Sequence, residues 1–214
     1  MSINVSGRAL APMVLALGLA AMAMPASAAV VVYDFDGLTD GTLLTSQFAG
    51  VLFGNTSVIN RAGLGVGGSL NDSEFPPKSG DGVAFDDGGT ISINFAAPIF
   101  SVAGYFTYID RLRLRAFDAS GFELGFVTST FTANTLLTGD VGSIPNELLS
   151  FSNASGLIAR VEITGNPLGT SFVLDDLTVD NGNTVPEPQT LLLALALLGA
   201  GCLPRGWMRR RSPA

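Results

Sequence analysis

The chain has 214 residues, with 18 acidic and 11 basic side chains, no histidine and a single cysteine. Without histidine there can be no Ser-His-Asp triad, and one cysteine allows neither an internal disulfide nor a zinc site made of thiolates and imidazoles. Carboxylate chemistry is therefore the main enzymatic option that the composition leaves.

The first 28 residues are predicted to be a secretory signal peptide. Arg8 supplies a positive start, residues 9–24 are apolar, and Pro25-Ala26-Ser27-Ala28 ends in a small-residue cleavage site. A permanent membrane anchor is the alternative, but about 16 apolar residues are short for a membrane span. We therefore expect export and cleavage after Ala28.

Residues 29–183 are expected to form the body of the protein, one domain with a single core. Seventeen of the 18 acidic side chains and six of the 11 basic ones fall in this body, which makes it acidic by about eleven charges. Because neutralising phosphates requires a basic face, we expect no nucleic-acid partner.

Short runs rich in Val, Ile, Phe, Thr and Tyr recur along the body, separated by Gly, Asn, Asp and Pro, and no window shows a helical period. This pattern predicts an all-β sandwich or barrel. The expected strands are 30–35, 51–53, 83–85, 90–95, 100–108, 111–117, 122–131, 157–163 and 171–179.

Acidic residues stand at both ends of the body. Asp34 and Asp36 lie at the end of the first expected strand, and Asp175 and Asp176 lie in the last one. If these two strands are neighbours, the four carboxylates meet, and calcium binds such oxygen ligands readily. The alternative is that Asp175 binds backbone amides or caps a turn while Asp176 faces water. A pair of glycosidase carboxylates is disfavoured because no aromatic platform marks a substrate groove there.

The segment 61–89 is rich in glycine and aspartate. Residues 63–68 have the spacing G-x-G-x-x-G, but no helix follows them and no strand-helix-strand unit surrounds them. We expect a long surface loop here and no nucleotide site.

A hairpin is expected around residues 118–121. Before this turn, Leu112, Leu114 and Ala116 alternate with three arginines, so the arginines share the exposed face of a strand. One interpretation is a solvated face paired with Glu123 and Asp110. The other is a binding stripe for anionic polysaccharide, formed by Arg111, Arg113 and Arg115.

Tyr105, Phe106 and Tyr108 form the densest aromatic cluster of the body. A lectin-like module would need such aromatics exposed on a concave sheet. Core packing is the alternative, and it is the one that we favour.

The chain ends in three successive elements. They are a Pro-Glu-Pro turn, an apolar run at 190–203 and a basic end. The prolines keep the approach to the membrane extended, the apolar run enters the bilayer, and the arginines stay on the cytoplasmic side. The residues that carry this pattern are Pro186, Glu187, Pro188, Arg205, Arg209, Arg210 and Arg211.

This ordered combination at 184–214 resembles the PEP-CTERM sorting signal of Gram-negative bacteria. The resemblance implies transient anchoring in the inner membrane, processing near Pro186 to Pro188 by an exosortase, and delivery of the body to the cell surface. One departure is that Pro204 ends the apolar run after about fourteen residues, below the roughly 20 of a stable span.

The body is similar to jelly-roll modules of the carbohydrate-binding-like and MAM-like kind. The similarity rests on Asp34-Phe35-Asp36, the runs 91–99 and 115–121, and Leu174-Asp175-Asp176-Leu177. It implies a two-sheet jelly-roll sandwich with cation ligation at Asp36 and Asp175, and it does not specify a ligand.

The leading hypothesis from the sequence is a non-enzymatic surface or extracellular-matrix protein, sorted through its tail and associated with exopolysaccharide. The alternative is a lectin-like module that recognises a defined glycan. An enzyme acting on polysaccharide is a third and weaker interpretation, because no catalytic constellation stands out.

Overall fold

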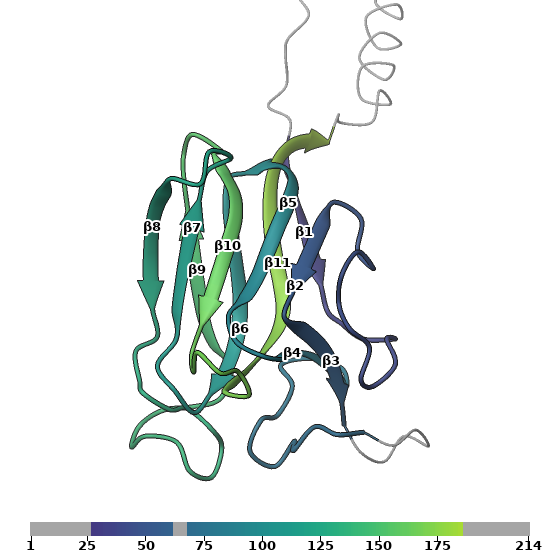
Figure 1. Cartoon of the computed structure of the whole chain (residues 1–214), viewed down its shortest axis with the longest axis vertical. Helices are drawn as coiled ribbons and strands as arrows, with labels where there is room; N and C mark the ends of the chain where they lie inside the picture. The colour runs from purple at the N-terminus through teal and green to yellow at the C-terminus, as the bar shows by residue number, and fades with distance from the viewer. Residues whose placement is uncertain (1–26, 62–67, 186–214) are drawn as a thin grey trace, which may run out of the picture.

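The computed structural model of the protein describes residues 27–61 and 68–185, and these form two antiparallel β-sheets packed face to face (Figure 1). The jelly-roll-type β-sandwich predicted from the sequence is thereby confirmed. Among the described residues, no helix is long and apolar enough to cross a membrane. Most of the predicted signal peptide and nearly all of the predicted sorting signal lie outside the described residues.

Sheet A has six strands: β1 (Ser27–Tyr33), β3 (Thr56–Asn60), β4 (Gly82–Asp86), β6 (Ser101–Tyr108), β9 (Glu147–Ser152) and β11 (Phe172–Val185). Their order is β3-β4-β11-β6-β9, and β1 pairs with the second half of β11. The first and last strands are therefore neighbours, with Tyr33 opposite Leu177. This pairing brings the two acidic ends of the body to the same region, as the sequence predicts.

Sheet B has five strands: β2 (Val51–Gly54), β5 (Ile91–Ile99), β7 (Arg113–Phe117), β8 (Glu123–Thr128) and β10 (Ile158–Thr164). Their order is β2-β5-β10-β7-β8. Since neighbouring strands lie about 4.8 Å apart, the outer face of sheet B is roughly 19 Å wide across its strands.

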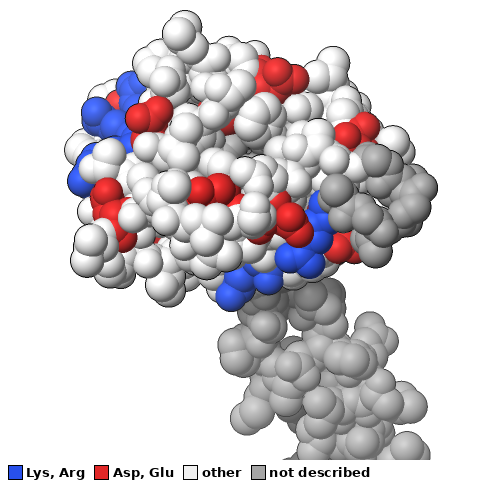
Figure 2. All heavy atoms as spheres, turned by 90° about the horizontal axis from the view of Figure 1, so that it is seen from below, with Lys and Arg blue, Asp and Glu red and all other residues white. Residues whose placement is uncertain are grey.

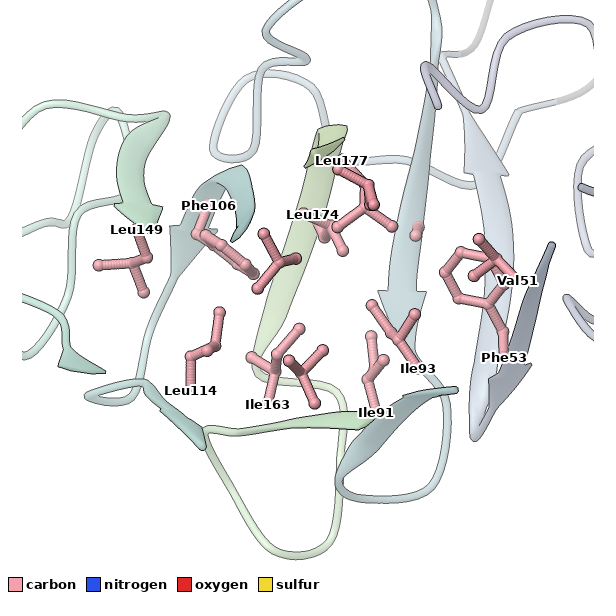
Figure 3. Close-up of a cluster of buried hydrophobic side chains, with 14 of the residues drawn as sticks. Val51, Phe53, Ile91, Ile93, Phe106, Leu114, Leu149, Ile163, Leu174 and Leu177 are labelled. Carbon is pink, nitrogen blue, oxygen red and sulfur yellow. The ribbon is translucent and has the colours of Figure 1, made fainter. Parts of the chain in front are cut away.

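The core lies between the sheets, where alternate side chains of both sheets point toward one another (Figure 3). Ile91, Ile93 and Ile163 enter it from sheet B, and Phe106 and Leu174 enter it from sheet A. Alternation of buried and exposed residues fixes the register, because a slip by one residue would turn every core side chain to the opposite face.

Two strands of sheet A, β3 and β9, were not predicted from the sequence. Strand β3 follows β2 after Asn55 alone, whose φ of 54° turns the chain from one sheet to the other. Strand β9 contains Glu147 and two serines, and it is stabilised by its pairing with β6. Both strands depend on contacts with distant strands more than on their own composition.

Candidate functional site

The outer face of sheet B carries an ordered group of charged and aromatic side chains. In β7, Leu114 and Ala116 are buried in the core, so Arg113 and Arg115 point to the other side of the sheet. Residues that are directly opposite in antiparallel strands share a face. We call this group the arginine face: Arg113, Arg115, Phe117, Glu123, Phe126, Arg160 and Glu162.

Five of these side chains form one chain of ion pairs. Arg115 Nη2 lies 2.6 Å from Glu123 Oε2, and Arg115 Nη1 lies 3.5 Å from Glu162 Oε2. Arg160 Nη1 is 2.7 Å from Glu162 Oε1. At the other end, Arg113 Nη2 is 3.8 Å from Glu123 Oε1. The glutamates therefore lie between the arginines and hold them in place.

The two phenylalanines support the arginines from below. The guanidinium carbon of Arg113 lies 3.9 Å from the centre of the Phe126 ring, and those of Arg115 and Arg160 lie 4.8 and 4.4 Å from the Phe117 ring. Such stacking adds about 0.5–1 kcal/mol at exposed sites and keeps the planar guanidinium groups oriented. Phe117 is buried, whereas Phe126 is half exposed.

Arg113 is the arginine of this face with the greatest freedom to bind a ligand. Its side chain is 48% exposed, and its contact with Glu123 is the longest of the four ion pairs. Most of its N–H donors therefore remain available, and the exposed part of the Phe126 ring lies beside them. In Figure 2, basic side chains gather with acidic ones at the upper left, on the side of β7 and β8.

Arg111 is exposed beside the buried Leu112, as the sequence suggests, but it is held by backbone oxygens. It precedes β7, and its guanidinium donates to the carbonyl oxygens of Ser129 and Thr130 at 2.9 and 3.3 Å. It is therefore tied to the segment that follows β8. Arg160 and Glu162 belong to the group instead, and the alternation of Arg160-Val161-Glu162 in a strand is the sequence signal that could have revealed them.

The aromatic cluster of β6 is divided between two faces. Phe106 and Tyr108 are fully buried in the core. The hydroxyl group of Tyr108 donates to Glu147, and burial, reinforced by that glutamate, raises the pKa of Tyr108 to about 12. Tyr105 faces the other side, where the amino group of Lys78 lies 4.5 Å from the centre of its ring. These three aromatics therefore do not form a common binding surface.

Asp175 is buried and binds backbone amides. Its Oδ2 accepts hydrogen bonds from the N–H groups of Lys78 and Ser79 at 2.7 and 3.0 Å, and its Oδ1 accepts from the N–H of Asp176 at 2.7 Å. Burial raises the pKa of Asp175 to about 6, against the opposing effect of these amides.

Asp36 holds the same segment from the other side. Its Oδ1 accepts from the N–H groups of Asp81 and Gly82 at 2.8 and 2.9 Å. Asp34 accepts from the N–H of Asp36 at 3.2 Å, and Asp176 accepts from the Ser79 hydroxyl at 2.8 Å. Asp36, Asp175 and Asp176 thus contact segment 78–82, whereas Asp34 contacts the backbone of Asp36.

Within the part of the chain that the structure describes, no group of three or more acidic, histidine or cysteine side chains is arranged to hold a metal ion. The observed contacts of Asp175 are those of the alternative in which it binds backbone amides. Calcium binding at these aspartates stays a prediction, and so does the role of the sorting residues Pro186 to Pro188 and Arg209 to Arg211, which lie outside the described residues.

No family model matches this chain, and no curated protein matches its sequence. Among solved structures, it is similar to the xylan-binding domain CBM22-1 of Paenibacillus barcinonensis Xyn10C, with 11% identity, a TM-score of 0.41, and coverage of 76% of this chain and 100% of that one. The family 29 carbohydrate-binding module CBM29_1 of Piromyces equi matches with 9% identity, a TM-score of 0.38, and coverage of 78% and 99%.

The K2 cleaved adhesin domain of Lys-gingipain matches with 12% identity, a TM-score of 0.39, and coverage of 71% of this chain and 99% of that one. Two of these three neighbours are described as carbohydrate-binding, and the third as an adhesin domain. At such identities and scores they say nothing about what this chain binds, so its function has to be argued from the side chains themselves.

Proposed function

We propose that this chain is an exported, non-enzymatic protein that binds an acidic polysaccharide through the arginine face. The observation that carries the proposal is the Arg113 guanidinium, stacked on the half-exposed Phe126 ring and held only loosely by Glu123. A planar guanidinium can bind a sugar carboxylate through two parallel hydrogen bonds. The neighbouring ring offers an apolar surface to the C–H groups of the same sugar.

The arginine face carries a net positive charge in an otherwise acidic body. Its three arginines exceed its two glutamates, whereas the body as a whole is acidic by about eleven charges. An acidic polymer is therefore attracted to this face and repelled by most of the remaining surface. The same distribution fits a protein that is retained among acidic exopolysaccharide.

The two glutamates of this face support a binding role over a catalytic one. Glu123 and Glu162 both form ion pairs with arginines, and each is placed between two of them. A glycosidase needs one carboxylic acid that gives up a proton and one carboxylate that is free to act on the opposite side of the sugar. Here the glutamates orient arginines instead.

Binding can be tested by affinity electrophoresis of the protein in gels that contain polygalacturonate or neutral dextran. We expect retardation by polygalacturonate that weakens as salt is raised, since exposed charges are screened. Arg113→Ser should weaken binding roughly tenfold or more, because a charge-assisted hydrogen bond contributes about 1.5–3 kcal/mol. The triple replacement of Arg111, Arg113 and Arg115 by serine should abolish it.

A matched control is Arg61→Ser. Arg61 is similarly exposed and ion-paired, with Asp72 at 3.3 Å, but it lies outside the arginine face. Its replacement should leave the retardation unchanged. Equal binding by the unmodified protein and the triple variant would show that the arginine face is only a solvated surface. Preferential binding to dextran would favour the alternative of a module for a neutral glycan.

We further propose that the protein reaches the cell surface through its C-terminal tail. The support comes from the order of the Pro-Glu-Pro turn, the apolar run and the arginine cluster in the sequence. In this scheme the inner membrane holds the unprocessed chain, an exosortase cuts near Pro186 to Pro188, and the sandwich is released to the surface of a Gram-negative cell.

A further inference from the structure

The first and last strands of the sandwich are paired up to their outer ends. Strand β1 begins at Ser27 and β11 ends at Val185, and the backbones of these two residues lie opposite each other. Ala28 lies opposite Thr184 in the same way. We call these two residue pairs the terminal ladder. It lies where β11 closes, at the upper end of the sandwich in Figure 1.

The terminal ladder lies outside the main part of sheet A. The pairing of β11 with β6 stops at Asp180, opposite Ser101. Residues 181–183 then interrupt the pairing with β1, and Gly182 among them has a φ of 62°. Among the residues that the structure describes, Thr184 and Val185 therefore have no strand neighbour other than β1.

Both predicted cleavage sites adjoin the terminal ladder. Signal peptidase is expected to cut after Ala28, which removes Ser27 and Ala28 from the mature chain. On the other strand, Val185 is followed directly by Pro186, the first residue of the Pro-Glu-Pro turn. The first cut therefore removes the β1 half of the terminal ladder and leaves Thr184 and Val185 without these partners.

The rest of the sandwich does not depend on the two removed residues. Residues 30–33 of β1 pair with residues 177–180 of β11, and all of them stay in the mature chain. Leu177 and Val179, which β1 covers in this way, belong to the buried core. The effect of the first cut is thus confined to the end of β11, beside the sorting turn.

We propose that removal of the signal peptide makes the tail accessible to the exosortase, so that the two cuts occur in a fixed order. This inference rests on the proposed sorting of the chain through its tail. A protein that binds an extended peptide pairs with the free backbone N–H and C=O groups of that peptide. The terminal ladder occupies such groups directly before Pro186. The first cut therefore supplies the substrate of the second.

The order of the strands along the chain gives this arrangement a use. Strand β11 is the last of the sandwich, so Ala28 is exported before β11 and can be cut before the terminal ladder forms. A chain that escapes this cut folds with the terminal ladder in place and keeps its tail. Only chains that are already freed from the membrane at the N-terminus are then released at the C-terminus.

Three variants of the full chain, expressed in a host that contains the exosortase, separate the cut from the pairing. Ala28→Leu replaces the small residue that signal peptidase requires but leaves the backbone of β1 unchanged. We expect mass spectrometry to find this variant with both its signal peptide and its tail. Ser27→Pro combined with Ala28→Pro also blocks the first cut, but it removes two backbone N–H donors of β1. This variant should keep its signal peptide and lose its tail.

The matched control is Ser27→Leu, at the variable position of the cleavage site, which should leave both cuts intact. Loss of the tail from Ala28→Leu as fast as from the unmodified protein would overturn the proposed order while leaving the sorting proposal standing. Retention of the tail by the double proline variant would assign the block to the retained signal peptide and not to the pairing. A tail that stays on the unmodified protein would overturn both proposals.

Hydrogen exchange measures the terminal ladder itself. Ala28→Leu and the double proline variant are purified as full chains from a host without the exosortase. In Ala28→Leu, whichever of the Thr184 and Val185 amides donates to β1 should exchange roughly fivefold more slowly, as expected for one net backbone hydrogen bond. Equal exchange of both amides in the two variants would show that β1 does not hold the end of β11, and the proposal would fall.

Discussion

Asp175 is a residue whose acid-base chemistry is strongly altered by the fold. It is buried, accepts three backbone N–H groups and has a pKa raised by burial to about 6. In the unfolded chain an aspartate titrates near 3.9. Between these two pH values the folded protein keeps a proton that the unfolded chain releases. The stability linked to this proton is therefore fully present below about pH 4 and is lost as the pH rises through about 6.

We expect Asp175→Asn to remove this pH dependence. An amide is neutral at every pH, so the free energy of unfolding of the unmodified protein should fall relative to the variant as the pH rises from 4 to about 6.5. The relative change should be on the order of 3 kcal/mol. Urea unfolding of both proteins at several pH values measures it. Parallel stability curves would show that Asp175 keeps an ordinary pKa.

The difference in the free energy of unfolding between the unmodified protein and Asp175→Asn reports on Asp175 alone and not on the other carboxyl groups. Burial also raises the pKa of Asp86, while hydrogen bonds to Ser120 and to the N–H of Phe122 lower that of Asp118. Both groups are present in the unmodified protein and in the variant. Their contributions therefore cancel in the comparison, whereas the absolute stability curve of either protein would mix all of them.

At the scale of elements, segment 78–82 joins the two ends of the body. Asp36, just after β1, and Asp175, within β11, hold its backbone N–H groups from either side. A calcium ion that binds here would have to compete with these amides for the carboxylate oxygens. Calcium binds here only if its bonds to the carboxylates are stronger than the hydrogen bonds that it displaces. The melting temperature in calcium and in chelator measures this difference.

We predict that calcium, if bound only by the folded state, stabilises the protein by roughly 2.7 kcal/mol at a hundredfold excess over its dissociation constant. Thermal melts in calcium and in chelator should then differ by several degrees. Asp36→Asn and Asp175→Asn should each abolish the difference, and magnesium should replace calcium poorly because it requires a tighter octahedral shell. Identical melting temperatures in calcium and chelator would leave the amides as the sole partners.

At the scale of the whole molecule, the arginine face and the last strand belong to different sheets. The arginine face lies on the outer side of sheet B, whereas β11 belongs to sheet A and is followed directly in the sequence by Pro186. A chain attached through β11 would leave the arginine face free to meet a polysaccharide.

If the tail is a sorting signal, the mature surface protein should lack the C-terminal apolar run. If an exosortase cuts near Pro186 to Pro188, mass spectrometry of the surface fraction should find peptides of the sandwich but none from Leu191 onward. Replacing Pro186 and Pro188 by alanine should leave the intact chain in the membrane fraction, since recognition depends on the extended turn. Intact Arg209 to Arg211 in the surface fraction would instead show a simple membrane anchor.

The amino-acid sequence was sufficient to predict the fold class and most strands, because alternation of apolar and polar residues is a local property with a period of two. It also indicated that Arg113 and Arg115 share the exposed face of β7, since Leu114 between them has to enter the core. The alternation extends to the exposed Arg111 beside the buried Leu112, but it could not show that Arg111 donates to the carbonyl oxygens of Ser129 and Thr130, because those partners lie after β8.

Which side chains meet was decided only by the tertiary structure. Glu162 is 47 residues from Arg115, and Lys78 is 97 residues from Asp175. The first pair arises because β7 lies beside β10 in sheet B. The second arises because the segment before β4 lies beside β11 in sheet A. The alternation of apolar and polar residues specifies neither arrangement. The order and register of strands follow from the packing of the two sheets as a whole, so no local stretch of sequence contains them.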